Sequence, residues 1–137
     1  MGKASTNGGR TAGKAIIGAI FASLLMKFFI LDFMIAEGNS MIPTIKPGAI
    51  LAVCKVSYGI RLPGSPAYLF QWRTPREGDV VVFYTPMGEI AVKRCGEILA
   101  DGVFYALGDN SSQSYDSRSY GPIPRDHVIG RVLGIKQ

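Results

Sequence analysis

The feature that most constrains this chain is an apolar segment close to its amino terminus. Residues 15–31 read AIIGAIFASLLMKFFIL, apolar except for one serine and one lysine, and the apolar character continues to residue 36. A helix that rises about 1.5 Å per residue would span roughly 33 Å over residues 15–36, enough to cross a hydrocarbon core of about 30 Å. The segment therefore predicts a single-pass transmembrane anchor over residues 14–36.

The charges on either side of this segment predict its orientation. The charged residues that precede it are all basic, whereas the acidic residues Asp32 and Glu37 lie at its far end. Because positively charged flanks are retained in the cytoplasm, the amino terminus is expected there and the rest of the chain across the membrane. Residues 1–13 are rich in small and polar residues and predict a flexible cytoplasmic tail. Met34 fits a signal-peptide cleavage site poorly, so the anchor is expected to be retained.

The remaining residues, 37–137, predict one mainly β domain. Short segments rich in Val, Ile, Phe and Tyr alternate with turn signals such as Thr-Pro-Met-Gly at 85–88, a pattern typical of antiparallel strands. The expected strands are 50–56, 79–84, 89–94, 103–107 and 128–135. Closely spaced strands without a second long apolar helix indicate a small antiparallel β-sheet or barrel.

Composition excludes several classes of function. Hydrophobic residues make up 47% of the 137 residues and charged residues 18%, which is too apolar for a disordered chain. Two cysteines and one histidine cannot supply the four ligands of a structural zinc site, so no such metal site is expected. A disulfide between Cys54 and Cys95 stays open at this point. The net charge of +5 comes without a recognition motif, so no nucleic-acid partner is expected.

Three clusters of residues could carry chemistry. Ser40 lies between Gly38 and Pro43 on a turn after the apolar segment, where its hydroxyl can project and backbone N–H groups can point to one spot. Lys93 lies on the returning strand of a hairpin, beside a small alanine. Residues 108–118 form a polar loop that could place a hydroxyl beside a buried amine. Each pattern alone is more typical of a turn serine, a solvated edge lysine or a solvated loop.

A lysine can act as a general base only in its neutral form. Its ordinary pKa of about 10.4 must fall to about 8 for half of the amine to be neutral at that pH, a preference of about 3.3 kcal/mol for the uncharged form. Burial of Lys93 against apolar side chains could supply this preference. The alternative is a solvated lysine paired with Glu89.

Together and in this order, the clusters resemble the type I signal peptidase family, the membrane serine proteases that remove signal peptides from exported proteins. The residues that carry the resemblance are Ser40-Met41-x-Pro43-Thr44, Gly78-Asp79-Val80-Val81-Val82-Phe83, Val92-Lys93-Arg94, Gly108-Asp109-Asn110 and Ser114-x-Asp116-Ser117-Arg118. These motifs cover most of residues 38–124. The resemblance implies an N-terminal transmembrane helix, a β catalytic domain of the signal-peptidase type on the extracytoplasmic side of a bacterial cytoplasmic membrane, and no cofactor.

The resemblance also implies roles for individual residues. Ser40 is expected to attack the scissile carbonyl, and Lys93 to take the proton of its hydroxyl as general base. Ser114 would orient the lysine amine. The backbone N–H of Ser40 would donate to the oxyanion. Some members of the family have a second donor, a side-chain hydroxyl, at the position of Gly38. Because glycine has no hydroxyl, only the backbone of Gly38 could supply a second donor in this chain. The residues expected to support the site are Asp109, Asp116 and Arg118.

The implied substrate is an extended signal peptide with small residues at positions −3 and −1, paired with a strand near the site. The residues expected to form the pocket walls are Met41, Ile45, Ala91 and Val92, all of which could equally be ordinary core residues. Other expected partners are the lipid bilayer and the protein translocation machinery. His127, the single histidine, follows an aspartate and offers a Ser-His-Asp alternative that a Ser-Lys dyad makes unnecessary.

Two segments distinguish this chain from larger members of the family. Only residues 95–107 separate the lysine motif from the polar loop, where larger members insert a second β domain, so the chain resembles a minimal catalytic core. Residues 57–77 look like an extra loop in which four aromatic residues are interleaved with three arginines. Because this composition suits the headgroup layer, we expect the loop to contact the membrane or the translocation machinery.

Two other functions stay open from the sequence. The small core and the extra loop could belong to a specialised peptidase that matures one pilin- or conjugation-type substrate. The chain could also be a catalytically silent, membrane-anchored β module that binds peptides. Cleavage of many unrelated preproteins favours the general enzyme, whereas a Ser40→Ala variant without any effect favours the silent module.

Overall fold

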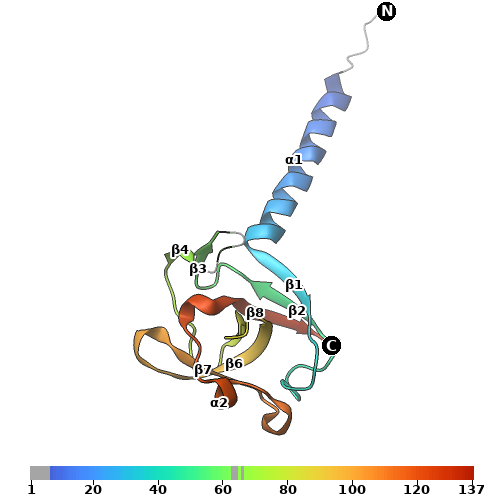
Figure 1. The fold of residues 1–137 in the computed structure, drawn as a ribbon. Helices are drawn as coiled ribbons and strands as arrows, with labels where there is room; N and C mark the ends of the chain where they lie inside the picture. Colours follow the sequence, from blue (N-terminus) through green and yellow to red (C-terminus); the bar gives the residue numbers. More distant parts are fainter. Residues whose placement is uncertain (1–6, 63–64, 66) are drawn as a thin grey trace, which may run out of the picture.

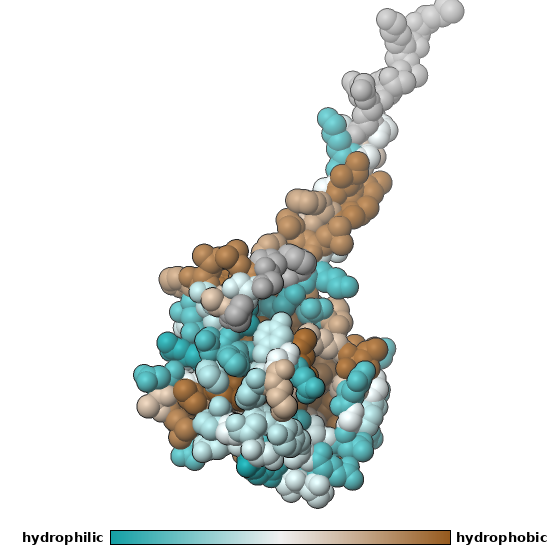
Figure 2. Space-filling view, viewed as in Figure 1, coloured by the Kyte–Doolittle hydropathy of each residue, from teal (hydrophilic) through white to brown (hydrophobic). Residues whose placement is uncertain are grey.

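The computed structural model describes residues 7–62, 65 and 67–137. One long helix, α1 (Asn7–Phe29), leads into a β domain from which it projects (Figure 1). Large apolar side chains are exposed along this helix, and they form the apolar surface seen along it in Figure 2. All motifs singled out in the sequence lie in the β domain.

The bounds predicted for the anchor, 14–36, are wrong at both ends. The helix begins at Asn7, within the expected tail, and ends at Phe29. Residues 1–6 of that tail lie outside the described part of the chain. The helix extends toward the amino terminus because no proline interrupts residues 7–29. Among the described residues, no helix combines the length and the apolar character needed to cross a membrane.

The end of the expected anchor is a strand. Residues Leu31–Ile35 form β1, which pairs antiparallel with β2 (Ile50–Cys54). Side chains alternate along β1, with Phe33 and Ile35 exposed and Asp32 and Met34 half-buried. A continuous apolar stretch does not distinguish a helix from a strand by hydropathy alone, which explains why the sequence placed this segment in the anchor.

Six strands form one antiparallel sheet in the order β1-β2-β8-β5-β6-β7. Besides β1 and β2, the strands are β5 (Val80–Tyr84), β6 (Ile90–Ile98), β7 (Phe104–Leu107) and β8 (Val128–Lys136). The predicted mainly β, antiparallel fold is therefore confirmed, and each of the five predicted strands is present with ends that differ by a few residues. The connections contain short helices, η1 (Ala100–Gly102), η2 (Ser111–Gln113), α2 (Ser117–Tyr120) and η3 (Arg125–His127).

The segment 57–77, predicted as a loop, contains a second, two-stranded sheet. Its strands are β3 (Gly59–Arg61) and β4 (Tyr68–Gln71). Residues 63, 64 and 66 between them lie outside the described part of the chain. Asp79 links the base of this hairpin to the main sheet. The hydroxyl of the buried Tyr58 donates to Asp79 Oδ2 at 2.9 Å, and Arg131 Nε on β8 lies 3.1 Å from Asp79 Oδ1.

The main sheet buries apolar side chains on both of its faces. On β5, Val81 and Phe83 belong to one core cluster and Val82 to the other, because successive side chains of a strand point to opposite faces. The second cluster also contains Met41 and Ile45, which flank the serine motif. The turn that carries Ser40 is therefore packed against the sheet.

The two cysteines are free thiols, so the disulfide that the sequence left open is not formed. Cys95 is buried on β6. Burial raises the pKa of its thiol to about 12, with further contributions from the negative charges of Asp79 and Glu77. At neutral pH this cysteine is an uncharged core residue.

Candidate active site

Ser40 lies on a turn between β1 and β2, and the polar loop holds this turn in place. The backbone N–H of Asn110 donates to the carbonyl oxygen of Ser40 at 2.9 Å, and its side-chain amide donates to the carbonyl of Asn39 at 3.1 Å. On the other side, the buried side chains of Met41 and Ile45 anchor the turn in the core. The serine hydroxyl is thus presented by a turn that is fixed from two directions.

Lys93 extends from β6 to the serine. Its amine nitrogen lies 2.5 Å from Ser40 Oγ, within hydrogen-bonding distance. The side chain is only 6% exposed. Burial lowers the pKa of the Lys93 amine, while the negative charge of Asp116 acts in the opposite direction. The structure therefore has the desolvated lysine that general-base chemistry requires, and not the solvated lysine of the alternative reading.

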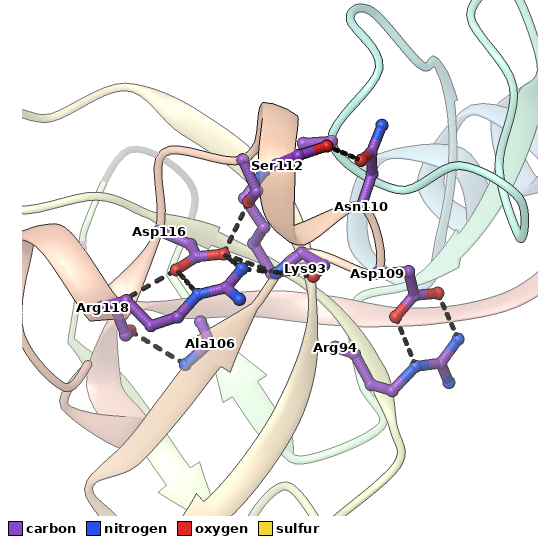
Figure 3. Close-up of polar contacts among 12 residues, drawn as sticks. Lys93, Arg94, Ala106, Asp109, Asn110, Ser112, Asp116 and Arg118 are labelled. Atoms are coloured by element: carbon purple, nitrogen blue, oxygen red, sulfur yellow. Dashed lines mark hydrogen bonds and ion pairs between the residues drawn. The ribbon is translucent and has the colours of Figure 1, made fainter.

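Asp116 is the centre of the polar contacts beneath the dyad (Figure 3). Its carboxylate accepts from Arg118 Nε at 2.9 Å and Arg118 Nη2 at 2.6 Å, and from the backbone N–H of Gly108 at 2.8 Å. Burial alone would raise the pKa of Asp116, but the hydrogen bonds from Arg118, Ser114 and Gly108 outweigh it and hold the pKa well below its ordinary value. This buried group is therefore a permanent negative charge at neutral pH.

Ser114 was expected to hydrogen-bond the lysine amine, and the structure gives its hydroxyl a different partner. Ser114 Oγ donates to Asp116 Oδ2 at 2.6 Å, and among the hydrogen bonds of the described residues none joins it to Lys93. The carboxylate attracts the only proton of the hydroxyl because a charged acceptor makes the stronger bond. Ser114 thus lies next to the site as part of the Asp116 cluster.

Gly108 allows the polar loop to approach the serine turn. A Cβ atom at this position would lie 2.1 Å from Ser114 Oγ and 2.7 Å from the carbonyl oxygen of Ser40. Both distances are far below ordinary van der Waals contact, so any side chain at 108 would push the two segments apart. The sequence analysis included Gly108 in a motif but gave it no role. The feature that could have indicated its role is the absence of a side chain, which permits a close approach of two segments.

A second charged cluster joins three of the sequence motifs. Asp109 accepts from Arg94 Nε at 2.8 Å and Arg94 Nη2 at 2.7 Å, and from the hydroxyl of Thr44 at 2.5 Å. The hydrogen bonds from Arg94, opposed by burial and aided by Thr44, lower the pKa of Asp109. The sequence named Asp109 as a support but missed Arg94 as its partner. Strand alternation could have indicated that Arg94 has a separate partner, because its side chain must point to the opposite face of β6 from Lys93.

The dyad opens onto a cavity of about 660 Å³. The four residues expected to form pocket walls, Met41, Ile45, Ala91 and Val92, line this cavity together with Ser40 and Lys93. The sequence missed a further wall, residues 33–36, because it assigned β1 to the anchor. Two strand segments, 33–35 of β1 with the following Ala36, and 90–93 of β6, therefore border a cavity that contains the serine and the lysine.

The remaining predicted positions also have clear places. Gly38 lines the cavity, and its φ of 76° is a left-handed conformation that favours glycine. The ring of His127 is engaged elsewhere, with Nδ1 3.1 Å from the carbonyl oxygen of Tyr84 at the end of β5. The structure pairs Ser40 with Lys93, so the Ser-His-Asp alternative finds no support among the described contacts.

The chain is similar to known signal peptidases. The family described as signal peptidase, peptidase S26, matches residues 10–98 and 92–135. A probable signal peptidase I-1 of Synechocystis sp. is 25% identical over 160 residues, which cover 84% of this chain and 76% of that protein. Signal peptidase I of Helicobacter pylori (strain J99) is 35% identical over 140 residues, covering 85% of this chain and 48% of the relative. Signal peptidase I of Buchnera aphidicola is 36% identical over 96 residues, covering 65% and 31%.

The matches differ in how much of each relative this chain covers. The chain spans about three quarters of the Synechocystis relative, about half of the Helicobacter relative and about a third of the Buchnera relative. The two segments matched by the family contain both residues of the dyad and the whole polar loop. The chain therefore belongs to the signal peptidase family, peptidase S26.

Proposed function

We propose that this protein is an endopeptidase that removes N-terminal signal peptides from exported preproteins, with Ser40 as nucleophile and Lys93 as general base. The observation that carries the proposal is the 2.5 Å contact between Lys93 Nζ and Ser40 Oγ on a buried lysine with a lowered pKa. A neutral amine at this distance can accept the hydroxyl proton as the oxygen attacks a carbonyl carbon. Membership of the signal peptidase family supports the same reaction.

The reaction would proceed through an acyl-enzyme. Ser40 Oγ attacks the scissile carbonyl while its proton passes to Lys93 Nζ, and the protonated lysine then gives that proton to the leaving amine. A water molecule, activated by the same amine once it is neutral again, hydrolyses the ester. The backbone N–H of Ser40, with that of Gly38, would stabilise the oxyanion of each tetrahedral intermediate. The Asp116 cluster would fix the geometry beneath the lysine.

The cavity would bind the residues before the cleavage site. An extended peptide could pair its backbone with the strand segments at 33–36 and 90–93, which would direct alternate side chains into the wall formed by Met41, Ile45 and Val92. Met41 and Ile45 are themselves buried in the core, so the pocket would be shallow. A shallow apolar pocket accepts small side chains, which supports small residues at positions −3 and −1.

We also propose that the protein works at a bacterial cytoplasmic membrane, with α1 in contact with lipid, the amino terminus toward the cytoplasm and the β domain on the extracytoplasmic side. The exposed apolar side chains along α1 and the basic residues before them support this location. A protease added to spheroplasts tests it. Digestion of the β domain in intact spheroplasts is expected, and protection until the membrane is opened would contradict the proposed orientation.

Cleavage of a preprotein with an Ala-x-Ala site by the detergent-solubilised protein tests the function. Wild type should cut after the −1 residue, and both Ser40→Ala and Lys93→Ala should be inactive. Ser119→Ala and Lys46→Ala serve as matched controls because both side chains are exposed and outside the site. Wild-type activity in Ser40→Ala would refute the dyad. Activity on only one pilin- or conjugation-type preprotein out of a panel would favour the specialised peptidase, and no cleavage of any would favour a peptide-binding module.

A further inference from the structure

Glu37 is the one acidic side chain among the residues that line the cavity beside the dyad. It lies between β1 and Gly38, and its side chain is exposed. The carboxylate makes no hydrogen bond and no ion pair with another described residue. The only other ionisable residue of the lining is Lys93, which is 6% exposed. Because an exposed glutamate is ionised at neutral pH, the accessible charge of the cavity is that of a carboxylate.

The part of β1 that lines the cavity has an unpaired backbone edge. Among the described strands, β1 is the outermost of its side of the main sheet and pairs with β2 alone (Figure 1). The N–H of Ala36 donates to the carbonyl of Ala49 at 2.8 Å, and its carbonyl accepts from the N–H of Gly48 at 2.9 Å. Because these directions alternate along a strand, the backbone groups of Ile35 and Glu37 point to the free edge. An extended substrate can add to β1 there.

The alternation of side chains decides what such a substrate places beside Glu37. Ala36 belongs to the core cluster of the pocket wall, and Met34 packs against it. Phe33 and Ile35 lie on the opposite face, where they are 59% and 69% exposed, and Glu37 continues this exposed face. Neighbouring strands turn opposed side chains to the same face. A peptide that directs its −1 and −3 side chains to the core face therefore directs its −2 side chain to the face of Glu37.

A long basic side chain at position −2 fits this face. Glu37 is three residues from Ser40, so their Cα atoms are at most about 11 Å apart, and the −2 residue is the neighbour of the residue whose carbonyl is attacked. An aliphatic stem can lie on the exposed Ile35 while the ammonium or guanidinium group at its end reaches the carboxylate of Glu37. An acidic −2 side chain would meet a like charge instead.

We propose that Glu37 is a specificity-determining residue that selects lysine or arginine at position −2 of the substrate, between the two small residues. This inference rests on the proposed peptidase function, and it names the class of signal peptide that the site prefers. Because the contact is exposed, the ion pair contributes a moderate preference of about 1.5- to 5-fold over a neutral side chain.

Three preproteins test the proposal. They have Ala-Lys-Ala, Ala-Met-Ala or Ala-Glu-Ala before the cleavage site, and methionine has a long unbranched side chain like lysine but no charge. With the detergent-solubilised full-length protein, kcat/KM should be about 1.5- to 5-fold higher for Lys than for Met at −2, and lower for Glu than for Met. The ion pair is present in the bound substrate and in the transition state alike, so the difference should be in KM rather than in kcat. In 1 M salt, which screens charges beyond about 3 Å, it should become smaller.

Variants of one residue assign the preference to Glu37. Glu37→Gln should remove the preference for Lys over Met, and Glu37→Lys should favour the substrate with Glu at −2 over the one with Lys. Glu97→Gln is the matched control, because it changes the net charge by the same amount at an exposed position of β6 that does not line the cavity. This control should keep the wild-type order. Equal kcat/KM for the three substrates in the wild type, or the wild-type order in Glu37→Gln, would overturn the proposal.

Binding separates this inference from the proposed peptidase function. Cleavage of the three preproteins with equal kcat/KM would remove the role of Glu37 and leave the dyad in place. The affinity of the same preproteins for the Ser40→Ala protein does not depend on cleavage, and it should decrease in the order Lys, Met, Glu at −2. The Ser40→Ala/Glu37→Gln protein should bind the first two equally. Equal affinities of Ser40→Ala for all three would contradict the proposal even if the wild type cleaves none of them.

Discussion

The sharpest test of the site geometry is Gly108→Ala, which adds a single methyl group. Gly108 is not in a left-handed conformation, so alanine meets no backbone strain and the effect is steric. The new Cβ would lie 2.1 Å from Ser114 Oγ, 2.5 Å from Ser114 Cβ and 2.7 Å from the carbonyl oxygen of Ser40. Ser114 can rotate its hydroxyl away, but the last contact is with backbone. The serine turn itself must therefore move.

The size of this movement follows from the distances. Ordinary contact begins near 3.4 Å, so the carbonyl of Ser40 must retreat by roughly 0.7 Å. A misplacement of about 1 Å in an active site can cost on the order of 100-fold in rate, and we expect a loss of kcat of tens of fold to about 100-fold. Overpacking of this kind also costs about 1 to 3 kcal/mol of stability.

Kinetics of preprotein cleavage, at a temperature well below the melting point of each variant, measure the effect. Gly134→Ala is the matched control, because a Cβ at this glycine meets nothing within 4 Å and its φ is not left-handed. The Gly108→Ala/Ser114→Ala double variant should remain impaired, since the clash with the backbone of Ser40 persists. Wild-type kcat in Gly108→Ala would refute the argument that the close approach of loop and turn positions the nucleophile.

Three further predictions concern buried polar groups. Tyr58→Phe leaves Asp79 without one hydrogen bond and should cost about 1 to 3 kcal/mol in urea unfolding, whereas Tyr120→Phe should cost nothing, because its buried hydroxyl has no partner among the described residues. Lys93→Met should be inactive but more stable than wild type at pH 7. Because burial lowers the pKa of Lys93, the stability of the wild type rises with pH up to the unfolded-state pKa near 10.4. The difference in melting temperature between Lys93→Met and wild type should therefore become smaller as the pH approaches that value. The lowered pKa of Asp116 gives stability that is present above about pH 4 and lost as the pH falls further, so acid unfolding should become less steep in Asp116→Asn.

The sequence predicted most of the β domain because its strands carry strong local signals. The run Val80-Val81-Val82-Phe83 can hardly be anything but a buried strand, and Thr-Pro-Met-Gly at 85–88 specifies the hairpin that returns as β6. The strand β1 was missed because an apolar stretch next to a helix has no boundary that hydropathy can detect. The short strands β3 and β4 were missed because pairing, rather than any periodicity of three or four residues, defines them.

The site could be predicted in part for a related reason. Motifs pointed to Ser40 and Lys93 because a hydroxyl and an amine are the groups that the proposed reaction uses. Partners were harder to predict, because a partner depends on distances between segments: the bond from Ser114 to Asp116 and the pairing of Arg94 with Asp109 arise only when the loop is folded onto the sheet. Each of these residues was in a recognised motif, but its contact was not.

The two aspartates show how the fold reconciles opposite demands on one small site. A general base must be desolvated, yet the turn and the loop around it need charged groups to hold them. Asp109 meets the second demand on the face of β6 opposite to Lys93, through Arg94, and so stabilises the loop from the far side of the strand. Asp116 must lie on the same side as the lysine, where its charge raises the pKa of the amine; the guanidinium of Arg118 offsets that charge with two hydrogen bonds. The lysine can therefore be buried beside a carboxylate while its pKa stays below its ordinary value, which is the direction that the proposed reaction requires.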